Sequence, residues 1–365
     1  MGLRCGIVGL PNVGKSTLFN ALTQAGAVAA NFPFCTIEPN HGIAEVPDER
    51  LRQLCRLVKP KQCTPTTLEV VDIAGLVKGA SQGEGLGNQF LDHIRNVHAL
   101  IHVLRCFDAE QVSHVGGSVD PLRDKEIVDL ELQLRDLETV SRRRQRLERA
   151  VQLGDREHQQ LAELLLACER HLQAGQPVRS LVLSVEQRQR LGELNLLTDK
   201  PVLYVCNVSE EDAARGNAYV ERLKPLVEAE GSELLVLSVA MEAEIVRLDD
   251  AADRQAFLQA AGLTEPALHR LIRSAYRLLR YVTFFTAGPK EVRAWTVTEG
   301  TTAQRAGGVI HSDFERGFIR AEVIAYDDFV ACGSEAACRQ AGKLRTEGRD
   351  YVVHDGDVIH FLFNV

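Results

Sequence analysis

Residues 9–17 read GLPNVGKST and decide the fold of the first part of the chain. They fit the phosphate-binding loop Gly-x-x-x-x-Gly-Lys-[Ser/Thr], in which backbone N–H groups and a lysine hold phosphates while the hydroxyl binds Mg²⁺. The apolar stretch LRCGIVG precedes this loop and the helix-forming stretch STLFNALTQ follows it. That strand, loop and helix context favours the motif over a glycine-rich turn with a surface lysine.

The loop is therefore expected to bind a nucleotide through its phosphates. Lys15 should reach the β- and γ-phosphates, and backbone amides at the start of the following helix should form the anion site. The loop residues expected to contact the nucleotide are Asn12, Val13, Gly14, Lys15, Ser16 and Thr17.

Two further segments supply the groups that a Mg²⁺-nucleotide hydrolase needs. VVDIAG (70–75) ends an apolar run with Asp72, which can hold Mg²⁺ through a water, and with Gly75, whose amide can face the γ-phosphate. Upstream, NFPFCTIEPN (31–40) offers Thr36. An aspartate at a strand end is usually only a cap, but this order behind a phosphate loop favours Mg²⁺ ligands. The predicted set is Ser16, Thr36 and Asp72.

Length and composition indicate a soluble protein of two or three domains. The chain has 365 residues, 45% of them hydrophobic and 25% charged. The net charge is −8, which argues against a general nucleic-acid-binding protein but leaves room for a local basic face. The sequence shows no secretory signal and no apolar run of the ~18–20 residues that span a bilayer. We expect a cytoplasmic protein without a membrane partner.

Apolar runs alternate with helix-length segments in the first two thirds of the chain. The runs are 3–9, 66–72, 99–105, 201–206 and 233–239. Near-continuous apolar strands of this kind indicate an α/β fold with a doubly wound, mostly parallel sheet.

The spacing of apolar residues changes twice along the chain. From about 126 to 175, helical spacing of apolar residues predicts two amphipathic helices broken near Gly154, which would form a projecting hairpin arm. After the stretch YRLLRYVTFFTAG (276–288), short alternating strands indicate a small α+β domain with a mixed sheet. The pairs Gly307-Gly308 and Asp355-Gly356 are expected to be turns between its strands.

The nine cysteines are scattered, without a Cys-x-x-Cys pair. We interpret them as reduced thiols rather than disulfides or zinc ligands. Cys35 lies in the segment that carries Thr36, so it is either a redox-sensitive residue of a switch loop or an inert small residue.

The segments GLPNVGKST, NFPFCTIEPN and DIAGLVKGASQGEGLGNQFLDHIR together resemble the Obg branch of translation-factor-related P-loop GTPases. The helical insertion and the C-terminal run DYVVHDGDVIHFLFNV are similar to those of the YchF subfamily of Obg-like ATPases, so the resemblance covers the whole chain. It implies a nucleotide-binding domain over 1–278, interrupted by a helical insertion at 126–197. It also implies a C-terminal, ubiquitin-like TGS domain over 279–365.

The catalytic group departs from that of ordinary GTPases. Ras-type enzymes place a water-orienting glutamine directly after Asp-x-x-Gly, but this chain has Leu76 there. The loop DAEQVSHVGG offers His114, which either orients or deprotonates water or is merely solvated. The expected catalytic residues are thus His114, Lys15 and Gly75. Asn12 leaves K⁺ beside the phosphates as an open alternative.

The residues expected around the base also differ from those of ordinary GTPases. Where GTPases carry Asn-Lys-x-Asp, this chain reads CNVSEED: Asn207 is in place, Val208 replaces the lysine and Glu210 the aspartate. Recognition of guanine should therefore be weakened. In the family that the chain resembles, this variation accompanies a preference for ATP. The alternative is that Glu210 is a solvated loop carboxylate. The residues expected around the base are Asn207, Val208, Glu210, Ser238, Val239, Ala240 and Met241.

Basic residues gather in the arm and in the C-terminal domain. The run SRRRQRLER carries Arg142, Arg143, Arg144, Arg146 and Arg149. It is either a solvated face or a contact to RNA phosphates. TGS domains occur in proteins that act around tRNA and ribosomes, which points the same way by analogy. The candidate contacts in that domain are Arg293, Lys343, Arg345 and Arg349.

The sequence thus favours a Mg²⁺-dependent ATPase switch that binds ribosomes and ribosomal RNA, acts as a monomer and has no DNA partner. One alternative is a nucleotide-gated ribosome or stress-response binding protein in which hydrolysis is incidental. Another is a GTPase that assists ribosome assembly, which Val208 and Glu210 disfavour.

Overall fold

The computed structural model describes residues 4–27, 41–73, 91, 93–109 and 118–364. The described chain divides into two compact units, one formed by residues 1–44 and 69–271 and the other by 45–68 and 272–365. Within the described residues, none of the helices is both long and apolar enough to span a bilayer.

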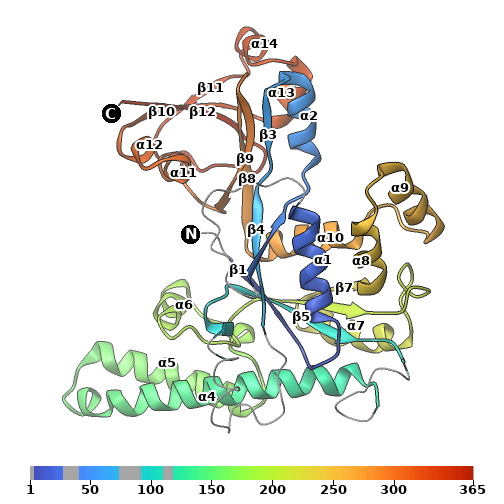
Figure 1. Cartoon of the computed structure of the whole chain (residues 1–365). Coiled ribbons are helices and arrows are strands. Elements are labelled where there is room, and N and C mark those ends of the chain that lie inside the picture. The colour runs from blue at the N-terminus through green and yellow to red at the C-terminus, as the bar shows by residue number, and fades with distance from the viewer. Residues whose placement is uncertain (1–3, 28–40, 74–90, 92, 110–117, 365) are drawn as a thin grey trace. The chain divides into compact units, whose positions relative to one another are not determined.

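The first unit is built on a six-stranded sheet with the order β2-β4-β1-β5-β6-β7 (Figure 1). The pairings of β4 with β1, β1 with β5, β5 with β6 and β6 with β7 are all parallel. Every residue of β5 and β6 is buried, which explains why these strands read as continuous apolar runs. The strands are β1 (Arg4–Val8), β2 (His41–Glu45), β4 (Thr67–Asp72), β5 (Ala99–Arg105), β6 (Val202–Asn207) and β7 (Glu233–Leu237).

Helices cover this sheet, and α1 packs against α8. These positions confirm the expected α/β class with a phosphate loop between the first strand and the first helix. The helices of this unit outside the arm are α1 (Lys15–Ala27), α7 (Ala218–Ala229), α8 (Val239–Arg247) and α9 (Ala251–Ala260), while α10 (Ala267–Leu278) begins in this unit and continues into the second.

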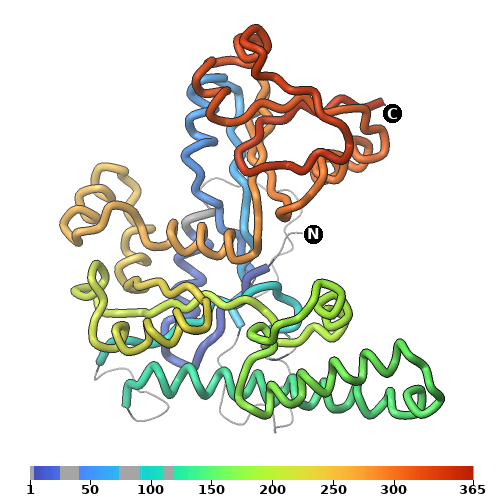
Figure 2. The backbone as a smooth tube through the Cα atoms, turned by 180° about the vertical axis from the view of Figure 1, so that it is seen from behind, coloured from blue at the N-terminus to red at the C-terminus, as the bar shows by residue number. Residues whose placement is uncertain are grey.

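The expected arm is an antiparallel pair, α4 (Pro121–Gln152) and α5 (Arg156–Gln173), which lie side by side in Figures 1 and 2. Gly154 has φ 81° at the break, and Asp155 caps α5. The 3₁₀ turn η1 (Val178–Ser180) and helix α6 (Val185–Gly192) complete the arm around its own apolar core.

A buried carboxylate fastens the returning chain to the arm. Asp136, 1% exposed, accepts hydrogen bonds from the backbone N–H groups of Leu197 (2.8 Å) and Thr198 (2.7 Å) and from the Thr198 hydroxyl (2.6 Å). Burial raises the pKa of Asp136, although these hydrogen bonds oppose that change. The three donors compensate for burying the group.

The second unit contains a mixed six-stranded sheet with the order β11-β10-β12-β8-β9-β3. β12 pairs in parallel with β8, and β3 with β9, whereas β8 and β9 form an antiparallel hairpin. The strands are β3 (Gln62–Thr64), β8 (Tyr281–Ala287), β9 (Glu291–Thr298), β10 (Phe318–Ile324), β11 (Arg345–Glu347) and β12 (Val358–Phe363). The helices are α2 (Glu49–Val58), α11 (Ala303–Ile310), α12 (Ser312–Arg316), α13 (Tyr326–Cys332) and α14 (Glu335–Gln340).

Segment 45–68 packs differently from the sequence-based division, which placed it in the first domain. β3 adds to the edge of β9, and Leu51 and Leu54 of α2 enter the core that contains Phe285 and Val292. The short strand β3 and helix α2 carry no signal that distinguishes the two sheets. Their shared core with the C-terminal strands places them in the second unit.

The pair Gly307-Gly308 is not a turn, so that expectation is wrong. Both residues lie inside α11. A Cβ on Gly307 would come within 3.3 Å of Phe314 Cβ and 3.4 Å of the Phe361 ring. Gly307 thus lets α11 pack closely against Phe314 and Phe361. Asp355-Gly356 behaves as a turn should, with Gly356 at φ 94°.

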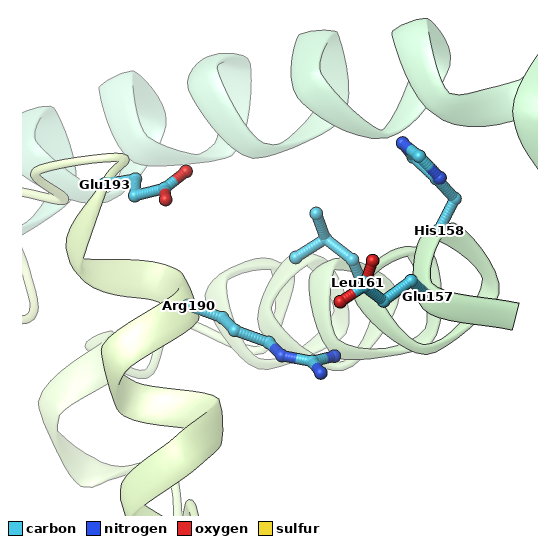
Figure 3. A pocket seen from close by; sticks show the side chains of 5 residues that line it. All are labelled: Glu157, His158, Leu161, Arg190 and Glu193. Atoms are coloured by element: carbon cyan, nitrogen blue, oxygen red, sulfur yellow. The ribbon is translucent and has the colours of Figure 1, made fainter.

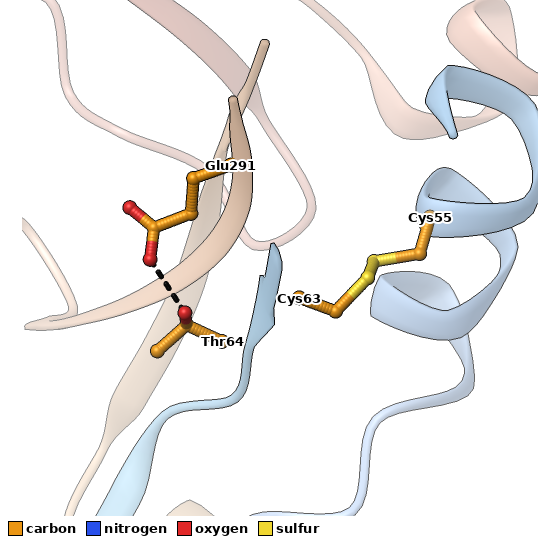
Figure 4. The surroundings of a disulfide bond; sticks show 4 residues. All are labelled: Cys55, Cys63, Thr64 and Glu291. Atoms are coloured by element: carbon orange, nitrogen blue, oxygen red, sulfur yellow. Dashed lines mark hydrogen bonds between the residues drawn. A yellow bond between two sulfur atoms is a disulfide. The ribbon is translucent and has the colours of Figure 1, made fainter. Parts of the chain in front are cut away.

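The expectation of reduced thiols is wrong for one cysteine pair. Cys55 of α2 and Cys63 of β3 form a disulfide with a Cα–Cα distance of 6.3 Å (Figure 4). The chain leaves α2 through Lys59 in the left-handed conformation and returns as β3, which brings the two residues within bridging reach. Such a pair, 8 residues apart, has no sequence signature. The other described cysteines are free thiols.

Candidate functional site

The phosphate loop connects β1 to α1 in the geometry that the motif requires. Gly14 has φ 102°, and a Cβ there would lie 2.7 Å from Asn207 Nδ2, so both the backbone and the close approach demand glycine. Asn12 has φ 63°, a conformation that asparagine adopts more readily than most residues. Val13 is buried, whereas Ser16 and Thr17 are exposed.

Lys15 is folded back onto its own loop. Its side chain is 7% exposed, and Nζ donates to the carbonyl oxygen of Leu10 at 2.7 Å. Burial lowers the pKa of Lys15 to about 8, although the charge of Asp72 acts in the opposite direction. A bound phosphate would offer this ammonium group a stronger acceptor than a carbonyl.

Asp72 ends β4 beside the strand that leads into the phosphate loop, with Ile7 as its partner in the parallel pair. Its Oδ1 is buried and has no hydrogen-bond partner within the described residues. A buried carboxylate oxygen of this kind, on the strand paired with the one that leads into the phosphate loop, fits the oxygen ligands that Mg²⁺ prefers. Asp72 and Ser16 are therefore suitable to hold the ion.

Several predicted residues lie outside the described parts of the chain. They are Cys35, Thr36, Gly75, Leu76 and His114.

Asn207 links the phosphate loop to the predicted base loop. The residue is 5% exposed. Its Nδ2 donates to the carbonyl oxygen of Val13 at 2.9 Å, and its Oδ1 accepts from the backbone N–H of Val239 at 3.0 Å. The side chain thus fixes three segments, the phosphate loop, the end of β6 and the start of α8, in one arrangement.

The other predicted base residues fall into two groups. Val208 is buried and its N–H donates to the carbonyl of Leu237 at 3.0 Å, which extends the strand pairing past Asn207. Glu210 has an exposed side chain, and its backbone carbonyl accepts from Ala213 N–H in a turn. After β7, Ser238, Val239 and Met241 are buried while Ala240 is exposed, and Ser238 Oγ caps α8 by accepting from Met241 N–H.

Sequence reasoning missed a buried carboxylate behind the base loop. Glu242, 1% exposed, accepts from the backbone N–H groups of Ala267 (2.7 Å) and Leu268 (3.2 Å) and so anchors the start of α10 to α8. Burial raises the pKa of Glu242, and the two hydrogen bonds oppose that change. Its spacing of three from both Val239 and Ile245 was the available signal, because those positions share the buried face of α8.

The arm arginines are not equivalent. Arg142 pairs with Glu138, and Arg144 Nε lies 2.8 Å from Glu169 Oε2, so both are engaged within the arm. Within the described residues, no ion pair involves Arg143, Arg146 or Arg149, and the last two are exposed. These three are the better candidates for contacts to a polyanion.

The candidate contacts of the second unit are also mostly engaged. The Arg293 guanidinium lies 4.1 Å from the centre of the Trp295 ring, and Lys343 Nζ lies 3.1 Å from Asp328 Oδ1. Arg345 donates to Tyr351 Oη at 3.0 Å. Arg349 is exposed.

Two family models match the chain. One, described as a 50S ribosome-binding GTPase, matches residues 4–139. The other, the C-terminal domain of YchF GTPases, described as a protein of unknown function, matches residues 281–364.

Whole-chain relatives extend these matches. The chain is 51% identical over 365 residues to the ribosome-binding ATPase YchF of Escherichia coli O157:H7, covering 100% of both chains. It is also 51% identical over 367 residues to the protein of that name from Bacillus subtilis, again covering 100% of both. The solved structure of the Schizosaccharomyces pombe YchF GTPase superposes with a TM-score of 0.90 at 38% identity, over 99% of this chain and 98% of that one.

Proposed function

Because the chain belongs to the YchF family, we propose that it is a Mg²⁺-dependent ATPase that hydrolyses ATP to ADP and phosphate and binds ribosomes. The observation that carries the chemistry is the pair formed by Lys15, a buried amine at the start of α1, and Asp72, which ends the strand paired with β1 and has a carboxylate oxygen without a hydrogen-bond partner within the described residues. The nucleotide state would then act as a switch for ribosome binding.

Each described residue of the phosphate site has a distinct role in this proposal. Lys15 would move from the Leu10 carbonyl to the β- and γ-phosphates, and Ser16 and Asp72 would hold the ion. Mg²⁺, when bound, neutralises charge that develops on the phosphates. Thr36 completes the ion's ligands, Gly75 senses the γ-phosphate, and His114 orients or deprotonates water. K⁺ beside Asn12 is a further proposal.

The preference for ATP over GTP rests on the base loop. In Asn-Lys-x-Asp GTPases a fixed carboxylate accepts hydrogen bonds from guanine, but here Glu210 is exposed in a turn and Val208 is a buried strand residue. The described segment CNVSEED therefore offers no carboxylate fixed for guanine at the position of that aspartate, and Asp212, further along, accepts a hydrogen bond from Asn217 Nδ2 at 2.8 Å. A site without a carboxylate fixed for guanine accepts adenine, because no buried carboxylate is left without a hydrogen-bond donor when adenine binds.

Ribosomal RNA is proposed as the partner of the exposed arginines on α4. Replacing Arg146 and Arg149 with Gln should lower the slope of log affinity against log salt by about 1 for each phosphate that the protein no longer neutralises. We expect the protein to act as a cytoplasmic monomer without a DNA partner. An unchanged salt slope would argue against these two arginines as RNA ligands.

Phosphate release from ATP tests the enzymatic proposal. Lys15→Ala should abolish turnover, while Lys224→Ala, an exposed lysine on α7, should leave turnover at the wild-type rate. His114→Ala should lower turnover and leave nucleotide affinity near wild type. Full activity of Lys15→Ala would contradict the assignment of the site.

A further inference from the structure

The helical arm carries a groove that neither the nucleotide site nor the arginine run explains. It lies between α5, the chain at 181–184 and α6, with a volume of about 470 Å³. This falls within the ~300–1,000 Å³ typical of ligand-binding clefts. Its lining includes Glu163, Leu164, Leu181, Val182, Leu183 and Glu186.

The groove offers apolar surface to water. Leu164 forms part of it at 5% exposed, where it also belongs to the arm core, whereas Val182 is 96% exposed. Two more leucines, Leu181 and Leu183, flank Val182 and are half-buried. An aliphatic side chain held so openly beside a concave apolar surface favours association, because contact removes its area from water.

The wall of the groove is held by local contacts. Ser184 and Gln187 form a capping box, with Ser184 N–H donating to Gln187 Oε1 at 2.9 Å and Gln187 N–H donating to Ser184 Oγ at 3.2 Å. Arg188 Nη1 lies 2.7 Å from Asp199 Oδ1, and Arg190 Nη1 donates to Gln160 Oε1 at 3.3 Å, which joins α6 to α5. A preformed surface needs less ordering when a partner binds.

The rim of the groove is acidic. Glu163 and Glu186 line it beside Arg190. Arg190 also lines a smaller adjoining pocket of about 170 Å³ with Glu157 and Glu193 (Figure 3). The two pockets together are thus lined by four carboxylates, one guanidinium and His158, and the four carboxylates are all on exposed residues. Such a rim repels phosphates and attracts lysine and arginine side chains.

We propose that this arm groove binds a basic segment of a ribosomal protein, with apolar side chains entering between α5 and α6. Proteins that lie on RNA carry basic extensions of this kind, and the arm would then contact RNA through α4 and protein through α5 and α6. The inference rests on the proposed ribosome binding and names one partner surface within it.

The test compares two exposed valines. Val182→Asn replaces apolar surface in the groove without adding a charge, whereas Val185→Asn changes a residue that is 76% exposed at the start of α6 and does not line the groove. Both side chains are exposed, so neither substitution should unfold the arm. Co-sedimentation with purified ribosomes should show at least about tenfold weaker binding for Val182→Asn and less than about twofold change for Val185→Asn.

Charge reversal and cross-linking complete the design. Glu163→Lys with Glu186→Lys should also weaken binding, while Glu228→Lys, exposed on α7, should not. A benzophenone amino acid at position 182 should cross-link to ribosomal protein upon irradiation. Equal binding of the two valine variants, or adducts with RNA alone, would overturn the groove assignment while wild-type binding persists. Absence of wild-type binding would overturn the proposed function together with this inference.

Discussion

Replacing Asn207 should separate the phosphate loop from the base loop. In Asn207→Ala, the carbonyl of Val13 and the N–H of Val239 lose their partners, at 2.9 Å and 3.0 Å, in a region where Asn207 is 5% exposed. Each buried backbone group left without a hydrogen bond costs about 1–3 kcal/mol. The free energy of unfolding of the first unit should therefore fall by about 2–6 kcal/mol, a large share of a typical total of about 5–15 kcal/mol.

Chemical denaturation in urea measures this change. Far-UV circular dichroism follows all the helices, most of whose described residues belong to the first unit, and fluorescence of Trp295, the sole tryptophan, follows the second unit alone. The midpoint of the first signal should shift, and ATP affinity measured by calorimetry should fall. A fall in stability under about 1 kcal/mol would contradict this role of Asn207, because two unsatisfied buried groups cannot cost so little.

Asn207→Asp separates the two hydrogen bonds. The carboxylate still accepts from Val239 N–H but places an acceptor against the Val13 carbonyl. A protonated carboxyl can donate to that carbonyl, so its pKa in the folded state should be raised above the unfolded value. The variant should therefore be relatively more stable at low pH and lose this stability as pH rises through the raised pKa. A pH-independent difference from wild type would show that Asn207 does not act as a donor to Val13.

Three further outcomes are expected. Since burial lowers the pKa of Lys15 to about 8, phosphates that raise it again should cause proton uptake when ATP binds near pH 8–9. Calorimetry in buffers of different ionisation enthalpy detects this uptake. If the Lys15→Met variant still took up a proton when ATP binds, Lys15 would not be the group that gains it. Asp136→Ala leaves the backbone N–H groups of Leu197 and Thr198 without their partner, so it should increase hydrogen exchange at Thr198 and lower stability by about 2–6 kcal/mol. Glu138→Ala, on the exposed face of α4, is the control, and equal exchange in both variants would contradict this role of Asp136. Two of the nine thiols, Cys55 and Cys63, should titrate only after reduction; full titration in denaturant without reductant would disprove the disulfide.

The parallel strands and the phosphate loop could be predicted because each rests on a local pattern. The apolar run at 99–105 coincides with β5, and the break at Gly154 separates α4 from α5. Helical spacing was less informative about burial: Leu130 and Leu134 fit the period of α4 but are 54% and 38% exposed. Periodicity identifies one face of a helix, but not how far a partner helix extends along it.

Contacts that depend on how the chain folds could not be predicted from such local patterns. β3 has only three residues, and its pairing with β9 joins segments more than two hundred positions apart. The disulfide between Cys55 and Cys63 depends on the path of the chain between α2 and β3. At the site, Asn207 was identified from its motif, but its two hydrogen bonds depend on where Val13 and Val239 lie in the fold.

The affinity of the purified protein for ATP and GTP, measured with Mg²⁺ present in parallel titrations, tests the proposed function most directly. In that proposal the phosphate loop holds any nucleoside triphosphate, while CNVSEED removes the preference for guanine. We expect clearly tighter binding of ATP, with Lys15→Ala weakening the binding of both nucleotides. Equal affinity, or tighter binding of GTP, would contradict the proposal.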